Sequence, residues 1–173
     1  FRRVFFRSRT FPVGGRFSDA QRDVYSVVLA AQQAAIDAVR PGASFDQPHQ
    51  AAVQVLTEGL VDLKLLKGKV SKLIEKEAYK RFYMHRTGHW LGMDTHDVGA
   101  YKVDGAWRAL EPGMVLTVEP GLYIDAGRDV PKELRNIGIR IEDDVLVTRE
   151  SHEVLTEAAP KSVEALEAMI AHE

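Results

Sequence analysis

The sequence contains no cysteine among its 173 residues. A disulfide-stapled fold is therefore excluded, and a cytoplasmic location is expected. The sequence also lacks an apolar run long enough to cross a bilayer, and its first ten residues, FRRVFFRSRT, lack the apolar core and cleavage site of a signal peptide. These absences predict a soluble protein that has no membrane partner.

Neither sign of charge dominates the chain. The sequence has 23 Lys and Arg residues against 25 Asp and Glu residues, which gives a formal net charge of -2. Because both signs are scattered, no basic footprint for nucleic acid or anionic membrane is expected. A small or peptidic partner is easier to accommodate.

The length and the hydrophobic content of 45% predict one globular domain over residues 1–173. Chains of this size typically bury roughly 70% of the surface that they expose when unfolded. The first residues are unusual, because Phe1 to Thr10 carries three aromatic residues and four arginines but no capping or turn residue. We interpret this start as a chain entered in the middle of an element, and we expect a partial domain.

The first half of the chain has apolar residues at helical spacing. Ser18, Asp19 and Gln21 form an N-cap signal before a periodic run, which predicts a helix from Ser18 to Val39. Similar patterns predict the other helices: Phe45 to Leu66, Ser71 to Tyr79 and, near the end of the chain, Ser162 to Ala171.

After Arg81 the pattern changes to short β-like runs separated by Pro-Gly and Gly turns. The predicted strands are Met114 to Val118, Leu122 to Ile124 and Ile137 to Val147. The sum predicts an α+β fold in which helices pack on one face of a mainly antiparallel sheet.

Three histidines fall in one string, FYMHRTGHWLGMDTHDVG. His85 and His89 are four residues apart, and His96 follows seven residues later. On a helix the first two would share a face, but Gly88 and the absence of a suitably placed Glu argue against a HExxH zinc site. Taken alone, this spacing is more typical of surface or core histidines.

Two acids lie at the ends of predicted strands. Glu119 follows an apolar strand in VLTVEPG, and Glu142 alternates with Ile139 and Ile141 in IGIRIEDDVLVT, on the same face as Arg140. Separately, these residues could cap a turn or line a solvated face. Together with one imidazole they form a ligand set that Mn, Co or Zn prefers, and an adjacent Arg can brace a ligating carboxylate. The combination indicates metal-assisted hydrolysis.

The longer strings resemble a known family. FYMHRTGHWLGMDTHDVGAY, LEPGMVLTVEPGLYI and GIRIEDDVLVT resemble the motifs of bacterial aminopeptidase P and prolidases. The likeness also covers TFPVGGRFSDAQRDVY, so it spans almost the whole chain. It implies a pita-bread fold and removal of an N-terminal residue that precedes proline, with a proline-containing peptide as substrate.

The resemblance also implies a set of metal ligands. His89 matches the ligating histidine, Glu119 a glutamate ligand and Glu142 the glutamate that bridges two metals. The family uses a dinuclear site, and we expect manganese, with zinc or cobalt as alternatives.

Three further residues match catalytic positions of the family. His96 matches the histidine that contacts the scissile peptide, and His85 the histidine near the proline-side pocket. Arg140 matches the arginine that braces a metal carboxylate.

The chain departs from the family at its start. Alignment on Arg9, Thr10, Phe11 and Pro12 puts Phe6 where the family has a metal-ligating aspartate, and the other ligating aspartate would fall before residue 1. Either the chain is a truncated domain, which we favour, or it is a natural homologue that lost its site. Both interpretations leave at most one weakly bound metal and an impaired or inactive peptidase. The alternative function is a non-catalytic homologue that binds peptides or a partner. An incomplete first hairpin would expose a sheet edge, which predicts a homo-oligomer.

Overall fold

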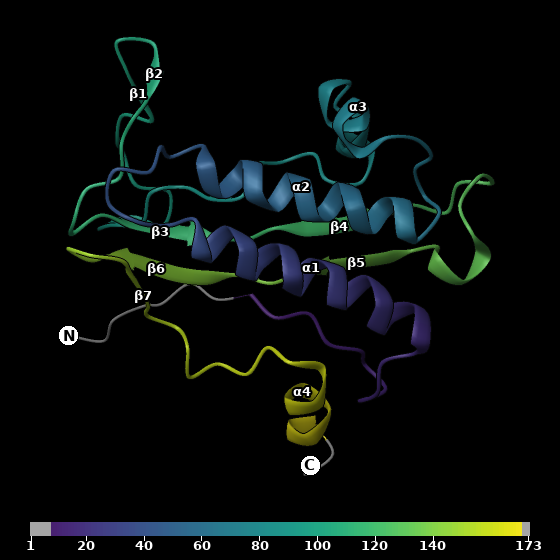
Figure 1. Ribbon diagram of the computed structural model, residues 1–173. Helices are drawn as coiled ribbons and strands as arrows, with labels where there is room; N and C mark the ends of the chain where they lie inside the picture. Colours follow the sequence, from purple (N-terminus) through teal and green to yellow (C-terminus); the bar gives the residue numbers. More distant parts are fainter. Residues whose placement is uncertain (1–7, 171–173) are drawn as a thin grey trace.

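The computed structural model describes residues 8–170 as the predicted α+β structure, in which helices pack on antiparallel strands (Figure 1). The α-helices are α1 (Asp19–Asp37), α2 (Gln47–Asp62), α3 (Val70–Glu75) and α4 (Val163–Ile170). There are also two 3-10 helices in the described chain: η1 (Ala78–Arg81) follows α3, and η2 (Lys132–Leu134) lies between the last two of these helices in the chain, among the strands. The strands are β1 (Lys102–Val103), β2 (Ala106–Trp107), β3 (Val115–Val118), β4 (Gly121–Ile124), β5 (Ile137–Arg140), β6 (Asp143–Val147) and β7 (His152–Val154).

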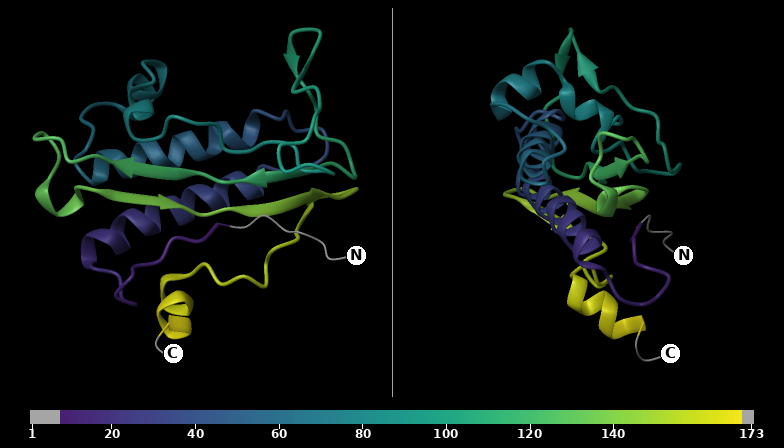
Figure 2. Two further views of the ribbon diagram at one scale, coloured as in Figure 1. Left: turned by 180° about the vertical axis from the view of Figure 1, so that it is seen from behind. Right: turned by 90° about the vertical axis from the view of Figure 1, so that its right-hand side faces the viewer.

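Helices α1 and α2 lie side by side and cover one face of the strands (Figure 2). Helix α1 begins with the predicted cap: the Ser18 side chain accepts from the Gln21 N–H, and the Gln21 side chain accepts from the Ser18 N–H. Its buried residues, such as Val24, Val28 and Ala31, recur at helical spacing and face the strands and α2. The amphipathic pattern therefore placed this helix correctly.

The other predicted helices are found with different ends. Helix α2 ends at Asp62, before the predicted Leu66, because Lys64 has a positive φ of 61° that a continuing helix excludes. The stretch predicted as one helix from Ser71 to Tyr79 is α3 followed by η1, with Glu77 in the left-handed region between them. In the described chain α4 ends at Ile170.

Strands β3 and β4 follow each other in one long ribbon, and β5 and β6 follow each other in a second ribbon that runs antiparallel beside it (Figure 1). Strand β3 pairs with β6, and β4 pairs with β5. The paired residues on either side of the interruption are Val118 with Asp143, and Gly121 with Arg140. Strand β7 extends the sheet beyond β6.

The prediction of one continuous strand from Ile137 to Val147 is wrong. Strands β5 and β6 occupy this range but belong to different ladders, with Ile141 and Glu142 between them. Opposite them lie Glu119 and Pro120, and a proline has no N–H to donate to a ladder. A long hydrogen bond of 3.4 Å, from the Ile141 N–H to the Pro120 carbonyl, bridges the interruption.

The predicted alternation survives the interruption. Ile139 and Ile141 are 2% and 0% exposed and lie in the core beneath α1. Arg140 and Glu142 alternate with these two isoleucines, so their side chains point to the opposite face, away from the helices. This face holds the candidate site.

A segment without regular structure runs along the free side of β3 and β4. The Thr117 N–H donates to the His89 carbonyl at 3.0 Å, and the Tyr123 N–H donates to the Phe82 carbonyl at 2.8 Å. These bonds fix the histidine-rich segment against the strands. In the part of the chain that the structure describes, no helix is both long and apolar enough to span a membrane.

Two expectations concern residues outside this range. The alignment of Phe6 with an aspartate ligand and the incomplete first hairpin both fall on residues 1–7, which lie outside the described residues. The single domain and the homo-oligomer stay predictions.

Candidate metal centre

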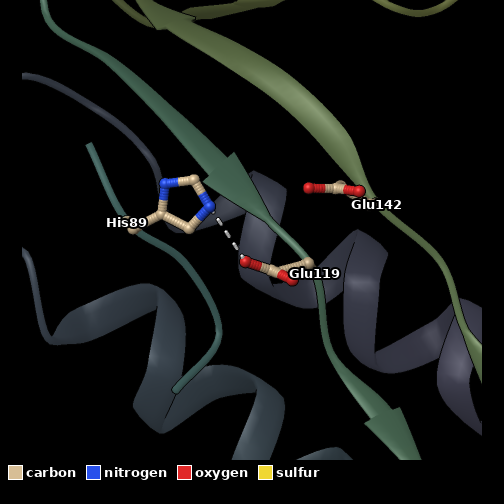
Figure 3. A group of neighbouring side chains, drawn as sticks. All are labelled: His89, Glu119 and Glu142. Carbon is tan, nitrogen blue, oxygen red and sulfur yellow. Dashed lines mark ion pairs between the residues drawn. The ribbon is translucent and has the colours of Figure 1, made fainter. Parts of the chain in front are cut away.

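The three predicted metal ligands lie together (Figure 3). Each of His89, Glu119 and Glu142 offers one ligand atom, and these atoms all lie within 4.8 Å of one another. Glu119 follows β3 and Glu142 precedes β6, so both carboxylates come from the interruptions of neighbouring ribbons. His89 joins them from the segment alongside β3.

The imidazole of His89 is held in one orientation. Its Nδ1 lies 2.9 Å from the backbone carbonyl of Trp90, and a carbonyl oxygen can only accept, so Nδ1 carries the proton. The lone pair therefore belongs to Nε2, which lies 3.3 Å from Oε1 of Glu119. Two lone pairs that face each other need a cation between them, either a proton or a metal ion. This is the arrangement typical of a metal-binding histidine.

Glu119 is held by neutral and positive groups on its other sides. The Thr117 hydroxyl donates to Oε1 at 3.3 Å, and Nη1 of Arg140 lies 3.4 Å from Oε2. Burial, and after it the nearby charge of Glu142, raises the pKa of Glu119, although Arg140 and His89 oppose the rise. A pair of carboxylates that repel each other in a buried site is stabilised by a bound cation.

Glu142 is buried, with 8% of the residue exposed. The Ser8 hydroxyl donates to its Oε2 at 2.6 Å, and the Glu142 N–H donates to the Ser8 carbonyl at 3.0 Å. One carboxylate oxygen of Glu142 lies within 4.8 Å of the ligand atoms of His89 and Glu119.

His96 lies at the edge of this group. Its ring centroid is 4.5 Å from that of His89, with the two rings tilted by 60°. The residue is exposed and belongs to the loop that follows the histidine segment. His96 therefore lies next to the candidate ligands and is exposed to solvent.

His85 and Arg140 form a second group with a tyrosine. The Arg140 guanidinium donates from Nε to the Tyr123 hydroxyl at 2.7 Å and from Nη2 to Nε2 of His85 at 3.0 Å. Because an arginine cannot accept, Nε2 of His85 carries the lone pair and Nδ1 donates to the Arg86 carbonyl at 2.8 Å. Burial is the main cause that lowers the pKa of His85, and the positive charge of Arg140 lowers it further. The hydrogen bond to the Arg86 carbonyl opposes this change, but the net direction is down, so His85 is neutral at pH 7.

Tyr123, Thr117 and Ser8 belong to the site but were not predicted from the sequence. Strand alternation could have indicated Thr117, which lies two residues before Glu119 on the same face. Tyr123 likewise lies two residues after the strand-opening Gly121. Nothing in the local pattern signals Ser8, because its contact with Glu142 joins residues 134 positions apart.

The donor set is one imidazole nitrogen and two carboxylates, and Arg140 pairs with the Oε2 atom of one of them, Glu119. Such a set suits Mn, Co or Zn better than a soft metal, which would prefer thiolates. The described residues therefore fit a divalent cation, and the observations that carry this conclusion are the contact of His89 Nδ1 with the Trp90 carbonyl and the closeness of the two carboxylates.

Comparison with known proteins gives a consistent result. Residues 7–149 match the model of Metallopeptidase family M24. An Xaa-Pro aminopeptidase of Haemophilus influenzae is 51% identical over 160 residues, which cover 92% of this chain and 37% of that protein. An Xaa-Pro aminopeptidase of Escherichia coli is 48% identical over 163 residues, covering 94% of this chain and 37% of that protein.

Solved structures agree. The aminopeptidase PepP of Pseudomonas aeruginosa superposes with a TM-score of 0.95 at 56% identity, over 96% of this chain and 38% of that one. Zinc-substituted aminopeptidase P of E. coli in complex with product superposes with a TM-score of 0.91 at 47% identity, over the same shares, 96% and 38%. The chain thus spans well under half the length of the relatives that it matches.

Proposed function

The chain belongs to Metallopeptidase family M24, and from this premise we propose that it forms the metal-binding part of an enzyme that hydrolyses the bond between an N-terminal residue and proline. The expected pita-bread fold is confirmed by the superposition on aminopeptidase P structures. The substrate class is proposed because the relatives are named Xaa-Pro aminopeptidases. The observation that carries the proposal is the convergence of His89, Glu119 and Glu142.

The proposed cofactor is a divalent cation held by these three residues. Manganese is our choice, with zinc or cobalt as alternatives. Such a cation supplies Lewis-acid chemistry and activates water for attack on a peptide carbonyl. The Nε2 lone pair of His89 and one oxygen from each of the two carboxylates would coordinate this cation.

The other residues act on the substrate and on the ligands. Arg140 lies beside Glu119 and keeps this carboxylate oriented toward His89. His96, exposed next to His89, is proposed to donate a hydrogen bond to the scissile carbonyl as charge develops on its oxygen. His85, held neutral beside Tyr123, is proposed to contact the proline side of the substrate.

The chain as given is proposed to be impaired. The resemblance puts Phe6 at the position of a ligating aspartate, and a phenyl ring has no lone pair with which to coordinate a divalent metal ion. We therefore propose at most one weakly held metal and little or no cleavage. This sequence feature also favours the second candidate function, a non-catalytic module that binds peptides in the same cleft.

Peptide cleavage and peptide binding separate the two candidates. The chain is incubated with an Xaa-Pro peptide and a matched Xaa-Ala peptide in excess Mn²⁺, and products and binding are measured. Slow hydrolysis of the Xaa-Pro peptide that disappears in Glu119→Gln supports the peptidase. Binding without any hydrolysis, equal in the parent and in Glu119→Gln, would support the binding module instead.

A further inference from the structure

A fully buried carboxylate adjoins the candidate metal centre. The side chain of Asp143 is 0% exposed and follows Glu142 directly in the chain. Its carboxylate accepts from four side chains, two of them cationic. The donors are Arg9 Nη2 at 2.7 Å, Lys161 Nζ at 2.7 Å, Gln32 Nε2 at 2.8 Å and Thr156 Oγ1 at 2.6 Å.

The two cations on Asp143 are not equivalent. Lys161 contacts Oδ2 of Asp143 through its single amine. Arg9 contacts Oδ1 through Nη2, and its Nη1 donates to the backbone carbonyl of Glu142. Of these two cations, Arg9 is the one whose two terminal nitrogens contact both the Asp143 carboxylate and the backbone of Glu142, the proposed metal ligand.

Glu142 needs such support because no strand ladder fixes it. It lies between β5 and β6, where the pairing of both ribbons is interrupted. Its N–H and its carboxylate are held by Ser8, and its carbonyl is held by Arg9. The segment of Ser8 and Arg9 thus replaces the hydrogen bonds that a continuous ladder would supply.

We propose that Arg9 is a positioning residue for metal binding, anchored by Asp143 so that it holds the Glu142 backbone and aims the Glu142 carboxylate at His89 and Glu119. This inference rests on the proposed function of the site. Lys161 neutralises the same buried carboxylate at the same distance of 2.7 Å. Arg9 also donates to the carbonyls of Pro160 and Ala159, so a merely structural role of Arg9 would lower stability without changing the Mn²⁺ affinity of the folded protein.

The test compares substitutions at the two cations. The free Mn²⁺ concentration is followed by electron paramagnetic resonance in titrations of the parent, Arg9→Lys, Arg9→Met and Lys161→Met, at a temperature where circular dichroism shows each to be folded. Arg9→Lys keeps the charge on Asp143 but loses the second arm. Both Arg9 variants are expected to bind Mn²⁺ about 10-fold or more weakly, as for other partners that orient a ligand. Lys161→Met is expected to bind like the parent even where its melting temperature is lower.

A second readout needs no metal. Hydrogen exchange of the Glu142 backbone N–H, measured by NMR in EDTA, is expected to accelerate in Arg9→Lys and to stay at the parental rate in Lys161→Met. Equal Mn²⁺ affinity and equal exchange in Arg9→Lys and parent, or equal losses in Arg9→Met and Lys161→Met, would overturn the positioning role. A parent that binds no Mn²⁺ contradicts the proposed function, and the exchange rates then still decide whether Arg9 orders Glu142.

Discussion

Nε2 of His89 faces Oε1 of Glu119 at 3.3 Å, and the bond from Nδ1 to the Trp90 carbonyl leaves the lone pair of the ring on that side. The relationship joins a segment without regular structure to the end of a strand. It is the arrangement that a bound cation would stabilise, and it gives the first prediction.

Replacing His89 by Ala is expected to weaken Mn²⁺ binding more than about 100-fold, because loss of a ligand should exceed the effect of losing an orienting partner. His152→Ala is the matched control. The Nδ1 of His152 also contacts a backbone carbonyl, that of Val39 at 2.8 Å, but His152 lies on β7. Isothermal titration calorimetry measures both affinities, and similar losses in the two variants would speak against His89 as a ligand.

The raised pKa of Glu119 predicts opposite effects of pH on metal binding and on stability. Because the folded state favours the protonated carboxyl, Glu119 contributes stability below the ordinary pKa of 4.5, and this contribution is lost as pH rises through the higher folded pKa. Metal binding needs the carboxylate and is expected to strengthen over the same window. Urea unfolding in EDTA checks the first trend against Glu119→Gln, which should lack it. A parent and variant with parallel pH profiles would exclude this account.

His85 is expected to be neutral at pH 7 with its proton on Nδ1. Arg140→Met is expected to raise the pKa of His85, since a neighbouring positive charge is removed, but not to its ordinary value, because burial is the larger cause of the lowering. NMR titration of the ring nitrogens measures the tautomer and the pKa. An Nε2-protonated ring in the parent would contradict the hydrogen-bond assignment.

Gly88 is expected to tolerate no side chain. A Cβ at this position would lie 2.0 Å from the Thr117 carbonyl oxygen, so Gly88→Ala must push the histidine segment away from β3. Overpacking of this kind typically costs about 1–3 kcal/mol of unfolding free energy. Gly14→Ala is the control, because nothing lies within 4 Å of its added Cβ. Chemical unfolding of both variants checks the difference, and Mn²⁺ affinity should fall only in Gly88→Ala.

The sequence was sufficient for the fold class and for the three candidate ligands that the structure brings together. Periodicity placed α1 and the two faces of the ribbons, because helical spacing and strand alternation are local properties that burial enforces. It did not reveal the interruption at Glu142, since an alternating apolar pattern continues through Ile139 and Ile141 while the ladder stops opposite Pro120. The cause lies in the partner strand, which local pattern does not identify.

The supporting residues of the site were hidden for the same reason. Ser8 reaches Glu142 across 134 positions, and Arg9 reaches Asp143 across an equal separation. Such contacts depend on which segments the fold brings together. Sequence reasoning therefore named the candidate ligands and Arg140, but not the contacts of Ser8 and Arg9 that hold Glu142.

The most direct test of the account is the number of metal ions that the chain binds. The protein is dialysed to equilibrium against buffer of known free Mn²⁺ concentration, and the manganese bound per chain is measured by elemental analysis beside a Glu119→Gln, Glu142→Gln double variant. The account predicts that the parent binds no more than one ion per chain, weakly, and that the double variant binds less than the parent. Two tightly bound ions in the parent, or equal binding in the double variant, would contradict it.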